Sequence, residues 1–166
     1  YTTLFRSSGA GGAGGEADEG GEAGEPDLTL YTSEAIGPLK PQMTDQQLIA
    51  ALGKPRARTR AVEEGATGAW VSTWTWADAT AVVTADKKTG PWTARNVGVS
   101  GRSKHATRRG IHVGSTRAEL EKAYPRTPGG TDDDPSLYLA GSPYGGVVFR
   151  LQADRVTGIE IGVFAF

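Results

Sequence analysis

An internal repeat constrains the fold of this chain more than any other feature of its sequence. Residues 37–53 align without gaps to residues 109–125, at an offset of 72 positions. Further along, residues 70–90 align to residues 138–158, at an offset of 68 positions. Because the two blocks recur in the same order, we expect one supersecondary unit to occur twice in tandem. The change of offset is expected to fall in loops, where changes of length are tolerated.

Each copy of the repeat opens with the pattern of a short, capped helix. Thr44 and Thr116 occupy matching positions ahead of apolar residues spaced by three and four. Thr is a favoured N-cap residue, and this spacing forms one apolar helix face. Gly53, Pro55 and Pro125 are expected to end the two helices. Helices this short are marginal in water, so each is predicted to pack against another element.

Strand-like stretches follow each helix and are separated by turn residues. The predicted strands span residues 70–76, 80–84, 93–99, 138–142, 147–152 and 157–164. Asp86 and Asp154 are placed at matching hairpin tips, where Asp is a favoured turn residue. Helices followed by runs of strands predict an α+β fold. We expect two tandem repeats, 29–101 and 102–166, each with a helix or helix-turn-helix and an antiparallel meander, and with the helices on one face of the sheet.

The front of the chain differs from the rest in composition. Residues 1–7 read YTTLFRS and resemble the translation of a short-read sequencing adapter, so we expect a metagenomic fragment whose signal region is missing. Residues 8–28 are rich in Gly and Glu and are predicted to form a disordered acidic linker. Without residues 1–27, the chain has 17 basic and 13 acidic residues. So small an excess of positive charge does not by itself indicate nucleic-acid binding.

Several classes of site are not indicated by the sequence. The chain contains no Cys, which excludes a disulfide scaffold and thiolate metal sites within these residues. Asp132, Asp133 and Asp134 do not match the spacing of a calcium loop, and His105 and His112 do not match a zinc motif. The sequence shows neither a nucleophilic serine elbow nor a phosphate-binding glycine loop. We therefore expect no metal, no cofactor and no enzymatic activity.

Two stretches of the sequence are rich in basic side chains. The first comprises Lys54, Arg56, Arg58 and Arg60, and the second comprises Arg102, Lys104, His105, Arg108 and Arg109. The simpler interpretation is that both are solvated loops. The alternative is attraction to an anionic membrane or envelope surface. Nucleic acid is the least favoured partner, because the basic residues are not part of a recognised binding motif and are accompanied by few aromatic residues.

Aromatic side chains form the main candidate surface for binding a partner. The candidate residues are Trp70, Trp74, Trp76, Trp92, Tyr138, Tyr144 and, at a hairpin tip, Asp86. Trp70, Trp74 and Trp76 share one face of a predicted strand. One interpretation is that they fill the core between helix and sheet, because Trp is highly buried on average. The other is an exposed platform, since the intervening Thr73 and Thr75 are small enough to pack beneath a helix and turn the Trp side chains outward.

The helix patterns resemble the repeat of the SmpA/OmlA (BamE) family of small outer-membrane lipoproteins. The match lies in residues 36–44 (IGPLKPQMT) and 52–55 (LGKP), with Gln42 where that family usually has Gly. The second copy retains the glycine as Gly114 but has Ser115 in place of Met. Two such units in tandem are similar to the beta-lactamase inhibitory protein. The resemblance implies a binding or assembly module outside the cytoplasm and, for the inhibitor type, a concave sheet face that holds a protein partner.

From these observations we expect a non-catalytic, extracytoplasmic binding module. It would be a tethered lipoprotein that recognises an unidentified protein partner through its sheet face. The alternative is a secreted or periplasmic hydrolase inhibitor of the beta-lactamase inhibitory type, with Asp86 as the candidate residue for entering the active site. A third hypothesis, an enzyme that acts on an envelope polymer, predicts a pocket in which polar groups converge.

Overall fold

The structure is a computed structural model that describes residues 25–128 and 131–165. Within these ranges the chain forms three helices and eight strands, and the strands belong to one antiparallel sheet. The predicted mixture of helices and antiparallel strands is therefore confirmed. The adapter-like residues 1–7 and residues 8–24 of the predicted linker lie outside the described residues.

The helices are short and the central strands are longer. The helices are α1 (Thr29–Ser33), α2 (Asp45–Leu52) and α3 (Arg117–Ala123). The strands are β1 (Ala57–Arg58), β2 (Val62–Glu63), β3 (Trp70–Thr75), β4 (Ala79–Ala85), β5 (Thr93–Ser100), β6 (Leu137–Ser142), β7 (Gly145–Gln152) and β8 (Arg155–Gly162). All six strands predicted from the sequence are present, with small shifts at their ends.

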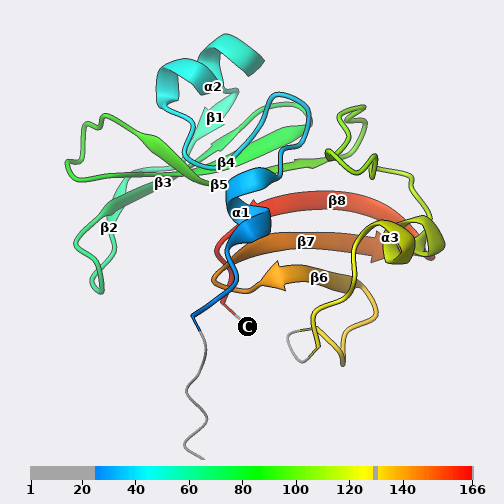
Figure 1. Ribbon diagram of the computed structural model, residues 1–166. Coiled ribbons are helices and arrows are strands. Elements are labelled where there is room, and N and C mark those ends of the chain that lie inside the picture. The colour runs from blue at the N-terminus through cyan, green and yellow to red at the C-terminus, as the bar shows by residue number, and fades with distance from the viewer. Residues whose placement is uncertain (1–24, 129–130, 166) are drawn as a thin grey trace, which may run out of the picture.

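The sheet joins the two halves of the chain through its central strands. Its order is β1-β3-β4-β5-β8-β7-β6, and β2 also pairs with β3 (Figure 1). At the centre, β5 pairs with β8, so that Val97 lies opposite Ile161 and Ser100 lies opposite Gly158. A continuous sheet therefore connects elements that are about 60 residues apart in the sequence.

Both predicted helices begin where their Thr residues indicate. The Thr44 hydroxyl accepts a hydrogen bond from the Gln47 amide at 3.2 Å, and the Gln47 side chain accepts one from the Thr44 amide at 3.0 Å. Thr116 and Glu119 form the same reciprocal pair at the start of α3. These capping boxes satisfy amide groups that would otherwise lack partners in the first helical turn.

Three small elements were not predicted from the sequence. The helix α1 has five residues and no side-chain N-cap, and the strands β1 and β2 have two residues each. Elements of this length carry too little periodicity to be recognised in a sequence. The tertiary structure holds α1 in place, since the Tyr31 hydroxyl donates a hydrogen bond to the carbonyl of Arg95 at 3.1 Å.

One hydrophobic core connects the helices to the sheet. Leu48 of α2 and Leu120 of α3 are fully buried in the same cluster as Trp74, Val97 and Ile161. The pairing of β3, β4, β5 and β8 places Trp74, Val97 and Ile161 on one side of the sheet, which we call the core face. The other side, which carries Thr80, Gly98 and Glu160, is called the outer face.

The approach to each helix requires an unusual backbone conformation. Gly114 has φ = 98° and Gln42, at the matching position ahead of α2, has φ = 70°. Glycine adopts this left-handed region at little steric cost, whereas a residue with a Cβ does not. Gln42 is therefore a residue with a Cβ at a position where the backbone conformation favours glycine.

Candidate functional site

The predicted aromatic platform is largely part of the core. Trp74 is 2% exposed and Trp76 is 7% exposed, so of the two interpretations the burial of the stripe in the core is confirmed for both residues and the exposed platform is wrong for them. The Trp74 ring lies 6.4 Å from the rings of Trp76 and Trp92, measured between centroids. The Trp76 indole donates a hydrogen bond to the Gly53 carbonyl at the C-cap of α2, at 2.8 Å.

The reason lies in which side chains fill the space between α2 and the sheet. The exposed-platform interpretation assigned that space to the small residues Thr73 and Thr75, but these lie on the outer face and are half-buried. The large indoles belong instead to the same buried cluster as Leu48 and Met43. Large rings remove more apolar surface from water than threonines would in the same place.

The remaining aromatic candidates are divided between core and surface. Tyr138 is 2% exposed, and its hydroxyl donates a hydrogen bond to the carbonyl of Tyr124, so the prediction that Tyr138 contacts a partner is also wrong. Trp70 and Trp92 are half-buried, and Trp92 packs against the core. Tyr144 is 68% exposed in the turn between β6 and β7.

Asp86 is exposed at the start of the connection between β4 and β5, as predicted for a hairpin tip. The structure thus leaves two of the seven candidate residues, Tyr144 and Asp86, fully on the surface. They lie in different turns of the sheet. They do not form the continuous platform that the sequence suggested.

The outer face presents an ordered array of side chains that the aromatic pattern did not reveal. One row crosses six strands in register and consists of Thr75, Thr80, Gly98, Glu160, Val148 and Leu139. The adjacent row consists of Ser100, Gly158, Arg150 and Leu137. Polar side chains therefore cluster over the central strands, whereas the apolar ones toward β6, Val148 and Leu139, are buried.

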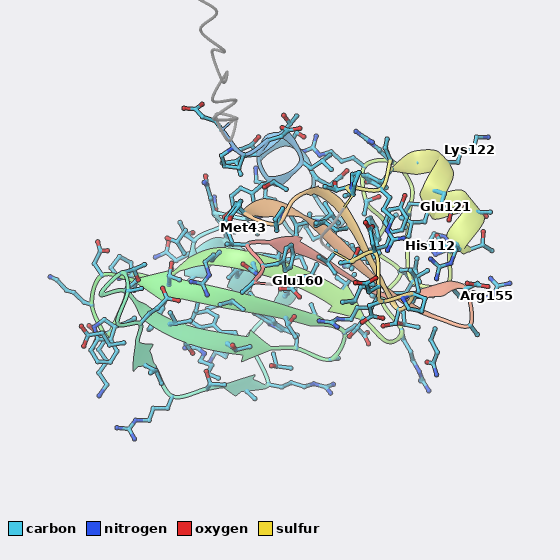
Figure 2. All side chains as sticks on the ribbon, turned by 90° about the horizontal axis from the view of Figure 1, so that it is seen from below. Met43, His112, Glu121, Lys122, Arg155 and Glu160 are labelled. Carbon is cyan, nitrogen blue, oxygen red and sulfur yellow. The ribbon has the colours of Figure 1, made fainter. Side chains whose placement is uncertain are left out.

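A hollow of about 150 Å³ opens in the middle of the outer face. Its lining includes Gly98 and Gly158, where two central strands carry no side chain. Two hydroxyl residues (Thr80 and Ser100) and two charged residues (Arg150 and Glu160) also line it. Figure 2 shows Glu160 on β8 near the middle of the sheet, away from the group labelled around α3.

The two charged groups of the hollow have different surroundings. Glu160 is half-buried, and its carboxylate accepts a hydrogen bond from the Asn96 side chain at 2.8 Å. Asn96 is itself held by the backbone of Val163, so the Glu160 carboxylate has a defined position. Arg150 is exposed, and within the described residues its guanidinium makes no ion pair. The hollow therefore offers a carboxylate that can accept a hydrogen bond from a ligand and a guanidinium that can bind an anion.

Shifted acid–base equilibria occur near this site and in the core. The pKa of Asp134 is lowered, mainly by hydrogen bonds from Ser136 and to a lesser extent by the positive charge of Arg150. Burial raises the pKa of Tyr138. Burial, followed by a hydrogen bond with Glu34, also raises the pKa of Tyr124. The two tyrosines therefore stay neutral at physiological pH and serve as structural hydrogen-bond donors.

The other polar candidates do not form a reactive cluster in the described part of the chain. Asp132 lies 3.6 Å from Arg126, and Asp134 bonds to Ser136. His112 hydrogen-bonds through Nδ1 to the carbonyl of Val113 at 2.9 Å. Among residues 25–128 and 131–165, no group of three or more His, Cys, Asp or Glu side chains is arranged to hold a metal ion.

The residues of the hollow were missed because no motif marks them. A usable signal existed in the stretch GIEIG at residues 158–162, where apolar and other residues alternate. Burial of Ile159 and Ile161 on the core face requires Glu160 and Gly158 to point the other way. The face of the sheet on which Glu160 lies could thus be predicted from the local sequence. The residues beside it on the neighbouring strands could not.

Comparisons with known proteins leave the function to be inferred from the structure. No protein-family model, no curated protein and no solved structure matches the chain. Within the part of the chain that the structure describes, none of the helices has the length and apolar character needed to cross a membrane.

Proposed function

We propose that this chain is a non-catalytic binding module that recognises a protein partner through the outer face of its sheet. The observation that carries the proposal is the hollow lined by Arg150 and Glu160, which brings an anion-binding group and a hydrogen-bond acceptor from two neighbouring strands into one small depression. Such paired groups fix the orientation of a bound segment, and the surrounding hydroxyls add hydrogen-bonding capacity.

We further propose that the module is built from two tandem helix-plus-sheet repeats with their helices on the core face. The backbone pairing ahead of the helices supports this. The Gln42 amide bonds to the Ala94 carbonyl and the Ala94 amide to the Met43 carbonyl; in the second half, Gly114, Val156 and Ser115 make the same two bonds. This places the start of β5 in the same role as the start of β8.

Irregularities in the sheet recur at matching places as well. The pairing of β4 with β5 shifts between Val82 and Val83, and the pairing of β7 with β8 shifts between Arg150 and Leu151. β-Bulges are local features that re-aim a strand, so two at equivalent positions favour a common unit. The strands β5 and β8 pair with each other at the centre of the sheet, and the hollow lies across that junction.

The location that fits this proposal is outside the cytoplasm, with residues 8–28 acting as a tether for the folded part. The acidic, glycine-rich composition of that segment supports a flexible spacer. The resemblance of the helix patterns to outer-membrane lipoproteins points in the same direction. The protein partner is the proposed ligand, and an anionic envelope surface remains a second proposed contact.

Binding through the hollow is tested by photo-crosslinking. A benzophenone amino acid at Ser100, on the rim of the hollow, is expected to yield a discrete adduct in a detergent extract of a bacterial cell envelope. The same probe at Ala50, exposed on α2, serves as the control and should not give that adduct. Arg150→Ala should reduce the adduct about tenfold or more, because side chains at the centre of an interface dominate its affinity.

A second variant separates binding from folding. A Cβ at Gly158 would lie 3.5 Å or more from its nearest neighbours, so Gly158→Ala should fill part of the hollow and leave the unfolding transition nearly unchanged. The exposed Arg60→Ala provides a matched loss of one positive charge elsewhere. An adduct that persists in Arg150→Ala and Gly158→Ala, or falls equally in Arg60→Ala, would contradict the proposed site.

An inhibitor of a hydrolase is the second candidate function, and the length of one hairpin favours it. Residues 86–92 connect β4 to β5, whereas two residues, Ala153 and Asp154, connect β7 to β8. An extended loop with an exposed acidic residue is the kind of element that can enter an active site. It is the chief difference in length between the two hairpins.

Shortening this loop tests the inhibitor hypothesis directly. Removal of the exposed residues 87–89, which keeps Trp92 against the core, should abolish inhibition of a serine beta-lactamase if the loop enters the active site. The substitution Asp86→Asn, which keeps the loop length, should weaken inhibition to a smaller degree. If the unaltered chain does not inhibit the enzyme, this candidate function fails, while the crosslink at Ser100 still tests the proposed outer-face site.

A further inference from the structure

Two basic stretches that are distant in the sequence meet at one groove. Arg56 comes from the stretch that follows α2, and Arg102, Lys104 and His105 come from the stretch that follows β5. All four line a groove of about 550 Å³. The sequence treats these stretches as separate loops, and only the fold makes them neighbours.

The sheet explains why the two stretches converge. The Arg56 amide donates to the Thr75 carbonyl at the end of β3, at 2.8 Å. The Ser100 amide at the end of β5 donates to the carbonyl of Asp78, in the turn between β3 and β4, at 3.0 Å. Because β3, β4 and β5 are consecutive and antiparallel, both segments emerge at the same end of the sheet.

The groove carries an excess of positive charge. Its lining contains three permanently cationic side chains (Arg56, Arg102 and Lys104) and a single carboxylate, that of Asp78. Asp78 accepts a hydrogen bond from the Arg102 amide at 3.3 Å, which ties the second stretch to the sheet. Among the residues that the structure describes, the three cations make no ion pair. A concave surface lined by one sign of charge concentrates the field on a ligand of opposite sign.

The walls of the groove are apolar and fixed. Trp76 and Leu52 form part of the lining, and the Trp76 indole is bonded to the carbonyl of Gly53. That bond also satisfies a carbonyl at the C-terminal end of α2, whose partial negative charge would otherwise oppose an anion. Three full positive charges outweigh a helix terminus equivalent to about half a charge.

We propose that this groove binds a phosphate group of a soluble, multiply charged ligand, such as a polyphosphate or a phosphomonoester. Guanidinium groups donate paired hydrogen bonds to adjacent oxygens of a phosphate, and Arg56 with Arg102 supplies two such groups. The volume is in the range of small-molecule sites. The groove shares no lining residue with the outer-face hollow, so the proposal stands apart from the proposed protein partner.

The proposal is tested by titrating the full chain with sodium tripolyphosphate and measuring the heat of binding by isothermal titration calorimetry. We expect saturable binding whose affinity falls as the salt concentration rises, because ions screen exposed charges. The double variant Arg56→Gln/Arg102→Gln should weaken binding about tenfold or more. Nuclear magnetic resonance signals of the His105 imidazole and the Trp76 indole should shift on titration of the unaltered chain.

A matched double variant distinguishes binding in the groove from a general effect of the net charge of the chain. Arg60→Gln/Arg108→Gln removes one cation from each basic stretch but leaves the groove lining intact. It should change the affinity less than about twofold, since both side chains are exposed and lie outside the site. If the first double variant does not fold, Lys104→Gln replaces it, with an expected loss of several-fold. Equal losses in the groove and control variants, or no saturable binding to the unaltered chain, would overturn the proposal.

Discussion

Replacing Trp74 by alanine is expected to lower the free energy of unfolding by about 3–5 kcal/mol. The side chain is 2% exposed and packs against Trp76 and Trp92. The Arg58 guanidinium lies over the Trp74 ring, 4.1 Å from the ring centroid. Truncation removes both the transfer free energy of the indole and its contacts with three neighbours, and it leaves a cavity that the sheet cannot close.

Urea denaturation monitored by far-ultraviolet circular dichroism measures this loss. Trp74→Phe keeps a ring in the site and should cost less than the alanine variant, which guards against a variant that does not fold. Val62→Ala, at a residue that is 62% exposed, should stay within about 0.5 kcal/mol of the unaltered chain. A loss of less than about 1 kcal/mol in Trp74→Ala would mean that the ring is outside the core.

Replacing Glu34 by alanine is expected to have a similarly large effect, about 3–5 kcal/mol. Glu34 is 4% exposed, and one carboxylate oxygen accepts hydrogen bonds from the amides of Ala35 and Arg108, at 2.9 and 2.7 Å. The other oxygen accepts one from the Tyr124 hydroxyl at 2.5 Å. Alanine would leave these three donors without their partner. Each such loss costs about 1–3 kcal/mol when the group is buried.

A double-mutant cycle with Tyr124→Phe isolates the part of this effect carried by the hydroxyl. We expect a coupling free energy of about 1–3 kcal/mol, because the two groups are in direct contact. Glu34→Gln keeps an oxygen acceptor and should destabilise the chain less than alanine does. Glu63→Ala, at an exposed position of β2, is the control. Purely additive losses would show that the Glu34–Tyr124 bond does not hold the two halves of the chain together.

The repeat in the sequence was informative about elements but inexact about equivalent positions. A gap-free offset of 68 places Thr89 and Gly90 opposite Thr157 and Gly158. In the structure the first pair lies in the connection between β4 and β5, and the second pair lies within β8. The connection differs in length between the two hairpins. The similar residues that follow each Asp are therefore not structurally equivalent.

Strand pairing also changes the partners of the aromatic residues. The sequence alignment matched Tyr138 with Trp70. In the structure Trp74 pairs with Ala81, and Tyr138 pairs with Phe149. Ala81 and Phe149 are equivalent, because each comes two residues before the residue that follows the register shift in its strand. Trp74 and Tyr138 are equally buried, and each has an arginine over its ring, Arg58 and Arg126 respectively. Under the proposed repeat, Tyr138 thus corresponds to Trp74.

Local sequence signals were sufficient to predict the two capped helices, six strands and the mixed α+β class. These features follow from local rules, namely a side chain that caps an amide, apolar spacing that forms a face, and turn residues that end a strand. The tertiary structure was needed to show that Trp74 and Trp76 are buried in one cluster with Leu48, and that Arg56 and Arg102 line one groove. It also placed Arg150 and Glu160 around one hollow. Alternation divides a strand into two faces but does not say which is buried, and no local pattern records which distant strands pair.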